Sequence, residues 1–170
     1  MRIINLLIVL FLVVSCQKSI ENYSVVILEN ETINSEFLKT INEPEKALLS
    51  WHLFAYGNEC DDSSLKIKCK LLRDLGIEDE CDSSHINNLL QWFSEDMLAI
   101  YKLRSCPNIA KESPIQNTFE FINLQRKSDT LSITYTVKGI NSVQEKSWNT
   151  TRTDAYLIRN ETFFKIDSNE

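Results

Sequence analysis

Glycine, proline and histidine are all scarce in this chain of 170 residues, with three, three and two copies. So few glycines and prolines argue against a low-complexity, collagen-like or loop-dominated chain. They also leave little material for a phosphate-binding loop. The sequence has no Gly-x-Ser-x-Gly elbow, no Walker-type loop and no His-Glu-x-x-His motif. This scarcity counts against nucleotide chemistry and against the common hydrolase and zinc-protease motifs.

The overall balance of the chain is that of an ordinary globular domain. Hydrophobic residues make up 43% of the sequence and charged residues 25%, so the chain can bury a real core and wholesale disorder is not expected. The formal net charge of −6 argues against a partner in nucleic acid. A length of 170 residues without repeats favours a single folded domain.

The N-terminus has the features of a targeting segment. Arg2 precedes an apolar stretch, Ile3–Val14, which is shorter than the about 20 residues of a membrane-spanning helix. The segment ends in Val13-Val14-Ser15-Cys16, which resembles the lipobox of bacterial lipoproteins. The resemblance implies cleavage before Cys16, lipidation of its thiol and acylation of the new amino terminus. Several acyl chains would hold the protein stably in a membrane.

This resemblance divides the chain into a lipoprotein signal peptide (1–15), a lipidated tether (16–22) and a single domain (23–170). By family analogy, an aspartate after the lipidated cysteine would favour the inner membrane. Gln17 stands there instead, so we expect an outer-membrane lipoprotein that faces the periplasm or the cell surface. The alternative is an ordinary secretory peptide cut elsewhere, which would leave Cys16 as a free thiol.

The first part of the domain is mostly helical in pattern. A β-branched strand is predicted over Tyr23–Leu28, followed by a short helix over residues 33–41. Proline opens a helix over residues 44–56 that is apolar nearly all round, which predicts burial on several sides. Residues 65–72 alternate like a strand, yet their leucines and lysines, with Gly76 behind them, favour a helix.

The clearest helical stripe lies in residues 84–104, where apolar side chains recur on one face. A single helix of this length would span about 30 Å. The polar triplet Ser94-Glu95-Asp96 interrupts the stripe, so two shorter helices are the alternative.

Five cysteines become an even four once Cys16 carries lipid, and four cysteines in an oxidising compartment predict disulfides. If the 30 Å helix is unbroken, Cys81 and Cys106 lie at its opposite ends and cannot pair. The preferred pairing is therefore Cys60–Cys106 with Cys69–Cys81. Free buried thiols are the alternative. A redox site lacks its Cys-x-x-Cys, and the wide spacings do not suit structural zinc.

From Ser113 onward the pattern changes to strands. They are predicted from Phe119, over Leu131–Val137, over Trp148–Ile158 and over Phe163–Ile166. An N-terminal strand and three or four helices followed by an antiparallel meander of about four strands is an α+β pattern. The early strand is a candidate fifth member of the sheet, and disulfides would brace the whole.

The ending, Tyr156–Asp167, resembles the closing hairpin of NTF2-like lipoproteins of the cystatin-like superfold. The resemblance covers the last third of the chain at best. It implies a cone-shaped pocket between helix and sheet, and it transfers no catalytic residue. The early strand, the extra helix and the four cysteines depart from the family pattern.

Candidate functional residues are few. His52 lies in the apolar helix and is expected to be packed, while His85 is expected near an exposed helix start. The acidic groups at 61–62, 78–80 and 95–96 are expected to be solvated loop or helix-start charges, because they have no metal-site spacing. The sequence therefore predicts no catalytic residue, no metal site and no cofactor.

Tryptophan gives the best candidates for binding. Trp148 stands on a polar strand near Arg152, so both are candidates for an exposed contact. Trp51 lies in an apolar helix and is expected mainly in the core, although it would line a pocket between helix and sheet.

Three functional hypotheses follow. The first is a non-catalytic envelope lipoprotein, anchored to the membrane by its lipid, that binds a small ligand or an envelope protein. The second is an inhibitor or immunity-type protein that caps an enzyme through the acidic loop 78–82. The third is an envelope hydrolase that uses His52 or His85.

Overall fold

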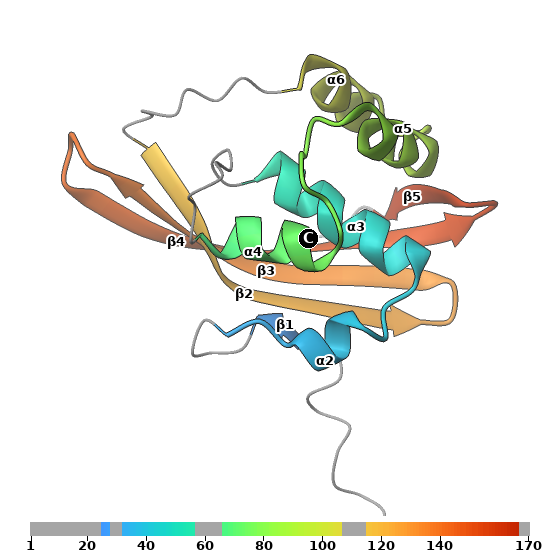
Figure 1. Ribbon diagram of the computed structural model, residues 1–170, viewed down its shortest axis with the longest axis horizontal. Helices are drawn as coiled ribbons and strands as arrows, with labels where there is room; N and C mark the ends of the chain where they lie inside the picture. The colour runs from blue at the N-terminus through green and yellow to red at the C-terminus, as the bar shows by residue number, and fades with distance from the viewer. Residues whose placement is uncertain (1–24, 28–31, 57–65, 107–114, 167–170) are drawn as a thin grey trace, which may run out of the picture.

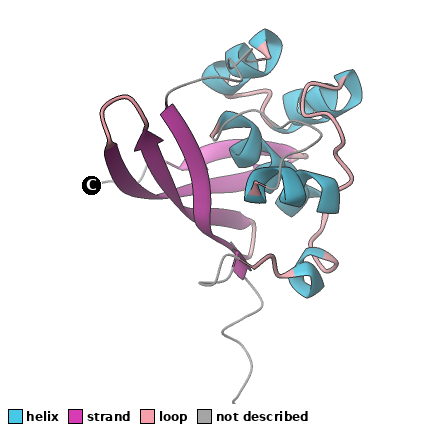
Figure 2. Cartoon of the chain, turned by 60° about the vertical axis from the view of Figure 1, so that its left-hand side comes forward, coloured by secondary structure: helices cyan, strands magenta, loops and turns pink. Residues whose placement is uncertain are grey.

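The computed structural model describes residues 25–27, 32–56, 66–106 and 115–166. In these residues, helices cover one face of an antiparallel sheet (Figure 1, Figure 2), and the predicted α+β class is confirmed. The predicted signal peptide, Cys16, the tether and Cys60 lie outside the described residues. Within the described part of the chain, no helix is long and apolar enough to cross a membrane.

The sheet is a meander of five antiparallel strands whose order in space follows the chain. The strands are β1 (Val25–Ile27), β2 (Ile115–Lys127), β3 (Thr130–Asn141), β4 (Lys146–Arg159) and β5 (Thr162–Ile166). The early strand joins the sheet as its fifth member by pairing with β2. Asn160 and Glu161 both have positive φ angles, 50° and 58°, which suits the two-residue hairpin between β4 and β5.

Five helices stand before the meander in the described chain. They are α2 (Ser35–Leu38), α3 (Glu43–Ala55), α4 (Ile67–Asp74), α5 (Ser83–Trp92) and α6 (Met97–Ser105). The ambiguous segment after residue 65 is therefore helical. A capping box opens α3, because the Asn42 side chain accepts from the Glu45 backbone N–H while the Glu45 carboxylate accepts from the Asn42 N–H. Pro44 fits the first turn.

The expected single helix over residues 84–104 is wrong, because the chain breaks it into α5 and α6. Asp96 causes the break: its carboxylate accepts a hydrogen bond from the Ala99 N–H at 2.9 Å and caps a new helix. The stripe of apolar residues also misleads, since Met97 is largely exposed. Two short helices that fold back on one another bring their outer ends together.

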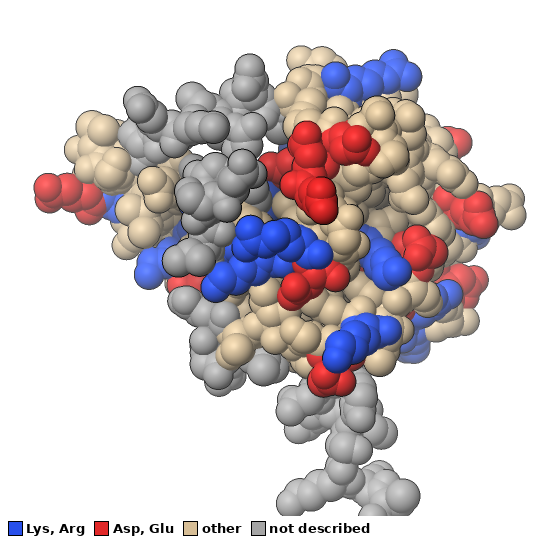
Figure 3. Space-filling model, in the orientation of Figure 1, with Lys and Arg blue, Asp and Glu red and all other residues tan. Residues whose placement is uncertain are grey.

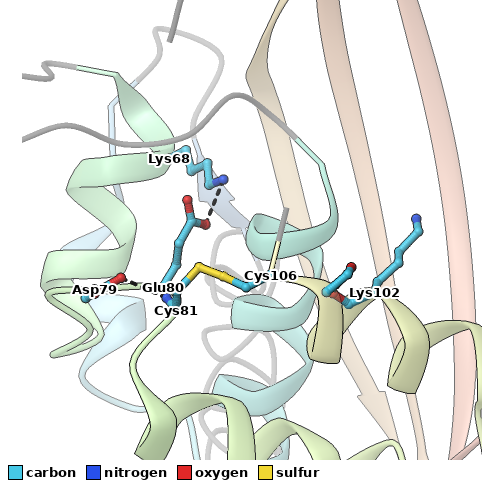
Figure 4. Close-up of a disulfide and its surroundings, with 7 residues drawn as sticks. Lys68, Asp79, Glu80, Cys81, Lys102 and Cys106 are labelled. Carbon is cyan, nitrogen blue, oxygen red and sulfur yellow. Dashed lines mark hydrogen bonds and ion pairs between the residues drawn. A yellow bond between two sulfur atoms is a disulfide. The ribbon is translucent and has the colours of Figure 1, made fainter. Parts of the chain in front are cut away.

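This break decides the cysteine pairing. Cys81 and Cys106 form a disulfide, with Cα atoms 6.0 Å apart (Figure 4), so the expected pairs Cys60–Cys106 and Cys69–Cys81 are both wrong. Close to the disulfide, the buried ammonium of Lys68 lies 2.8 Å from a carboxylate oxygen of Glu80 (Figure 4). Together these contacts hold the loop between α4 and α5 against the end of α6. Cys69 is also a disulfide cysteine.

The core lies between α3 and the sheet. Eight of the thirteen residues of α3 are buried, as its apolar sequence predicts. On β3, alternate residues point into this core, among them the fully buried Leu131, Ile133 and Tyr135. Trp51 is only 7% exposed and packs against Phe93, with ring centroids 5.1 Å apart. It is therefore a core residue.

Candidate functional site

A buried polar cluster joins α3 to β4. His52 is 1% exposed, and its Nδ1 lies 3.0 Å from the Leu48 carbonyl oxygen while its Nε2 lies 3.3 Å from Oδ2 of Asp154. On the other side of Asp154, the Lys165 ammonium lies 3.0 Å from Oδ1. The Tyr135 hydroxyl donates to Asp154 at 3.5 Å. One carboxylate thus connects the central helix, β3 and β5.

The electrostatics of this cluster follow from its contacts. The hydrogen bond from His52, together with the nearby Lys165 ammonium, holds the pKa of Asp154 well below its usual range, against the opposing effect of burial. Burial raises the pKa of the Tyr135 hydroxyl far above its usual value, and the neighbouring Tyr56 hydroxyl adds to this rise. Asp154 is therefore an anion and Tyr135 a neutral donor at neutral pH.

The cluster is not arranged for nucleophilic catalysis. Both ring nitrogens of His52 already face acceptors, and none of its described hydrogen-bond partners is a serine or a cysteine. Three tyrosine rings also enclose the imidazole, at centroid distances of 5.2 to 6.1 Å: Tyr56, Tyr135 and Tyr156. This leaves no ring nitrogen for a substrate, so His52 and Asp154 act as a buried tie between helix and sheet.

A more exposed group of side chains lies next to the His52–Asp154 contact. The Arg152 guanidinium donates to the Tyr56 hydroxyl at 3.5 Å, and it stands 5.8 Å from the centre of the Tyr56 ring. The Lys102 ammonium of α6 lies 5.5 Å from the same ring. Trp148 is 41% exposed. It lies four residues before Arg152 on β4 and therefore on the same face of the sheet. Trp148 and Arg152 are thus both accessible, while Trp51 is in the core.

A second site is an open groove of about 570 Å³ at the other end of α3. It lies between the first turns of α3, the loop from α4 to α5 and the first turns of α5. Its charged lining residues are four acids and one base: Glu43, Glu78, Asp79, Asp82 and Lys46. Figure 3 shows acidic side chains gathered between α4 and α5 on this side of the molecule. We call this site the acidic groove.

Some of these carboxylates also hold the backbone. Asp82 caps α5 by accepting from the N–H groups of Ser84 and His85, at 2.8 and 3.4 Å, and hydrogen bonds from Ser84 lower the pKa of Asp82. Asp79 accepts from the Cys81 N–H at 2.8 Å, beside the disulfide. Glu43 and Glu78 form no such backbone contact among the described residues and are exposed. The Lys46 ammonium lies 3.2 Å from Oε1 of Glu43. Both carboxylates are exposed, so they are the ones that a partner can reach.

His85 also lines the groove and is only partly exposed. Its Nε2 is buried and has no hydrogen-bond partner in the described part of the chain. Burial lowers the pKa of His85, although the charges of Asp82 and Asp79 oppose this shift. A neutral imidazole therefore stands among four carboxylates with one polar atom unsatisfied.

Sequence reasoning found only part of this groove. The sequence predicts solvated charge at residues 78–80, and the inhibitor hypothesis makes the loop 78–82 a contact surface. Glu43, Lys46 and His85 were not connected with it, because the groove depends on how α3 packs against α5. The helix-start pattern was the available signal: residues just inside two helix N-termini lie close together when the helices pack side by side.

The arrangement offers no described group of three His, Cys, Asp or Glu side chains that could hold a metal ion. Comparison with known proteins adds nothing further, because no family model, curated protein or solved structure matches this chain.

Proposed function

We propose that this protein is a membrane-anchored, non-catalytic interaction domain of the cell envelope, and that its acidic groove receives a cationic segment of an envelope protein. The observation that carries the proposal is the groove itself, which is lined by four carboxylates and one lysine. A cationic segment in this groove would meet side chains of opposite charge, which favours its binding.

The membrane anchor in this proposal rests on the N-terminal sequence. The lipobox-like Val13-Val14-Ser15-Cys16 supports lipidation of Cys16, and Gln17 supports the outer membrane. Two cysteines of the domain are joined in a disulfide, which fits an oxidising compartment outside the cytoplasm.

The other hypotheses rank below this one for specific reasons. A small ligand in a helix–sheet pocket has less support, since Trp51 packs into the core. A hydrolase has less support, since both nitrogens of His52 face acceptors. The inhibitor or immunity-type role uses the same groove and differs only in that the partner is an enzyme. It would be favoured if a partner captured in the groove lost activity on binding.

Site-directed photo-cross-linking in the native envelope tests the groove. A photoreactive amino acid at position 88 lies in its lining, while the same group at the equally exposed position 87 does not. We expect a defined cross-linked product from position 88 and none from position 87. The double variant Glu43→Gln/Glu78→Gln should reduce that product at least about fivefold, because charge recognition is lost.

The matched control changes the same charge elsewhere. Glu95→Gln/Glu145→Gln removes two exposed carboxylates that do not line the groove, and it should leave the product unchanged. Equal products from positions 87 and 88, or a product that survives the groove variant, would overturn the proposed site. A Cys16→Ala variant tests the anchor separately, and it should appear in the soluble fraction.

A further inference from the structure

Strand β4 leaves half of one edge unpaired. On one side it pairs with β3 over twelve consecutive positions, from Lys146 to Leu157. On the other side β5 pairs only with Ala155–Arg159. No described strand covers the outer edge of Lys146–Asp154. We call this segment the open edge. It belongs to the β3–β4 hairpin, which extends beyond the helices (Figure 1, Figure 2).

The open edge has little of the protection that edge strands in monomeric proteins usually have. Such strands are short, bulged, charged, interrupted by proline or covered. Of these features, the segment has two exposed charges, Lys146 and Arg152. This segment contains no proline or glycine, and its pairing with β3 shows no bulge. Every residue from Lys146 to Thr153 is exposed. A row of backbone N–H and C=O groups therefore faces outward, at a site where another strand can add.

Most of the exposed apolar side chains of the described residues belong to the sheet. The described chain exposes nine large hydrophobic side chains, and three of them lie together on α6. The other six belong to the strands or to the β3–β4 turn: Ile115, Ile140, Val143, Trp148, Phe164 and Ile166. Trp148 lies on the open edge itself, and Ile166 lies where β5 ends beside it.

We propose that two copies of this chain pair through their open edges, antiparallel, with Thr150 on the two-fold axis. The segment Ser147–Thr153 would pair with itself, and the two five-stranded sheets would become one continuous sheet. The occupant of the edge is a second copy because the sequence of the edge is complementary to itself about Thr150. Two-fold pairing gives every contact twice.

The complementarity is visible pair by pair. Pairing about Thr150 sets Trp148 opposite Arg152 of the second copy, which places a guanidinium against an indole. It also sets Asn149 opposite Thr151 and Ser147 opposite Thr153, so that polar side chains meet polar side chains on the other face. Thr151 and Thr153 already form hydroxyl pairs at 2.9 Å with β3 in each copy, which extends the polar row across the joined sheet.

Other registers are less favourable. A shift of one residue would set side chains of opposite faces against each other. Moving the axis to Asn149 would place Lys146 opposite Arg152, so that like charges face each other. Moving the axis to Thr151 would bring Ser147 opposite Ala155, which β5 already pairs. Of these registers, the one on Thr150 avoids these problems.

The same register accounts for two exposed apolar residues. The second copy of β4 would continue the line of β5, so its hairpin turn would lie beside the end of β5. Val143, in that turn, is 77% exposed, and Ile166, at the end of β5, is 42% exposed. Pairing about Thr150 therefore brings two exposed apolar side chains of different copies next to each other.

Disulfide trapping of the lipoprotein in its own membrane tests this dimer. Thr150→Cys places a cysteine next to its own symmetry mate, since residues directly opposite in a sheet have Cα atoms about 4.5 to 5.5 Å apart. We expect a disulfide-linked dimer on non-reducing gels. Thr153→Cys, on the same exposed strand, would lie roughly 20 Å from its mate and should remain monomeric.

A second pair of variants tests the register in purified protein by sedimentation. Trp148→Arg would set two arginines opposite each other, and it should weaken dimerisation at least about tenfold. The swap Trp148→Arg/Arg152→Trp restores the Trp–Arg pair in the opposite order and should recover most of the dimer. Trapping of Thr150→Cys only to a different protein would assign the edge to another partner and overturn the proposal. So would a monomer at all concentrations, or equal trapping at residue 153.

Discussion

The two halves of β4 have the same partner strand and opposite environments. Asp154–Arg159 lies under the helices, where Tyr156 is 2% exposed, while every residue of Lys146–Thr153 is exposed. Length explains the difference. The central helix α3 has 13 residues, or about 20 Å, whereas the 14 residues of β4 span about 47 Å. One helix of this length covers less than half of the strand.

The covered half is held by specific contacts as well as by burial. Phe163 packs against Trp92 and Phe93, with ring centroids 5.0 Å apart in both pairs, and against Tyr156 at 5.6 Å. Such aromatic pairs each contribute about 0.5 to 1.5 kcal/mol beyond burial. The exposed half has its backbone pairing with β3 and solvent-exposed hydrogen bonds, such as those of Thr151 and Arg152. Stability therefore resides in one half of the strand, which leaves the other half available for contacts outside the molecule.

The largest predicted effect comes from removing the carboxylate of Asp154, which lies between the exposed and the covered half of β4. Asp154→Ala would remove the carboxylate that contacts Nε2 of the buried His52, the Lys165 ammonium and the Tyr135 hydroxyl. We expect a loss of about 3 to 5 kcal/mol in the free energy of unfolding, because a buried charge that is shared by three hydrogen-bonding partners is removed. Thr150→Ala, four residues away in the exposed half, should change it by less than about 0.5 kcal/mol. Urea denaturation measures both.

Acid titration gives an independent check on the same contact. The pKa of Asp154 is lowered in the folded state, so the unfolded chain binds the proton more tightly. The contribution of Asp154 is therefore complete above about pH 4 and is lost as the pH falls further. The wild type should lose this stability in acid and Asp154→Ala should not. A variant with the same acid dependence as the wild type would show that Asp154 is not the group responsible.

The second prediction concerns the disulfide that ties the end of α6 to the loop before α5. Its cysteines are separated by 25 positions, and closing a loop of that length stabilises a fold by about 3.5 kcal/mol in the chain-entropy account. Cys81→Ser/Cys106→Ser should lose up to this amount in thermal or urea unfolding. The exposed half of β4 should keep its exchange rates in hydrogen exchange, because the disulfide braces only the helices.

Peptide mapping completes the cysteine assignment. With Cys81 bonded to Cys106 and Cys16 expected to carry lipid, Cys60 is the remaining partner for Cys69. We therefore predict a Cys60–Cys69 peptide under non-reducing conditions. Recovery of Cys69 linked to Cys16 would instead contradict both this pairing and the lipidation of Cys16.

The strands of this fold could be predicted well from the sequence, and the pairing of distant side chains could not. Alternation over Leu131–Val137 predicted the inward and outward faces of β3, because period two is a local property. The polar triplet Ser94-Glu95-Asp96 signals the helix break, but the apolar stripe continues through Met97 and favours one helix. An unbroken helix would keep Cys81 and Cys106 apart, so the predicted cysteine pairing is wrong for the same reason.

The candidate sites show the same limit. The position of His52 in an apolar helix predicted a packed histidine, but its carboxylate partner is 102 positions away. Trp148 and Arg152 could be placed on one face by alternation, while Tyr56, which Arg152 contacts, comes from another element. The acidic groove is formed by the starts of two helices, and packing rather than local sequence brings them together.

The third prediction, with a smaller effect, concerns His85 in the first turn of α5. Burial lowers the pKa of His85, so the unfolded chain binds a proton more readily near pH 6 than the folded chain does. Stability should therefore fall as the pH drops below about 6.5, with a slope of at most about 1.4 kcal/mol per pH unit. His85→Gln should flatten this slope, as followed by thermal unfolding between pH 5 and 7. An unchanged slope would assign it to other groups.

The smallest stability effect is expected on the exposed side, at Gly139. This residue is paired with Trp148 across β3 and β4, and a Cβ at position 139 would overlap the indole ring. Because Trp148 is 41% exposed, its ring can swing into solvent, so Gly139→Ala should cost less than about 1 kcal/mol.

The same overlap in the covered part of the sheet would displace packed core side chains and cost more. What changes here is the position of the indole. We expect a shift in its fluorescence, and we expect weaker pairing of the open edges, because Trp148 would no longer meet Arg152 of a second copy. A large loss of stability would show that the exposed half of β4 contributes to the fold as much as the covered half does.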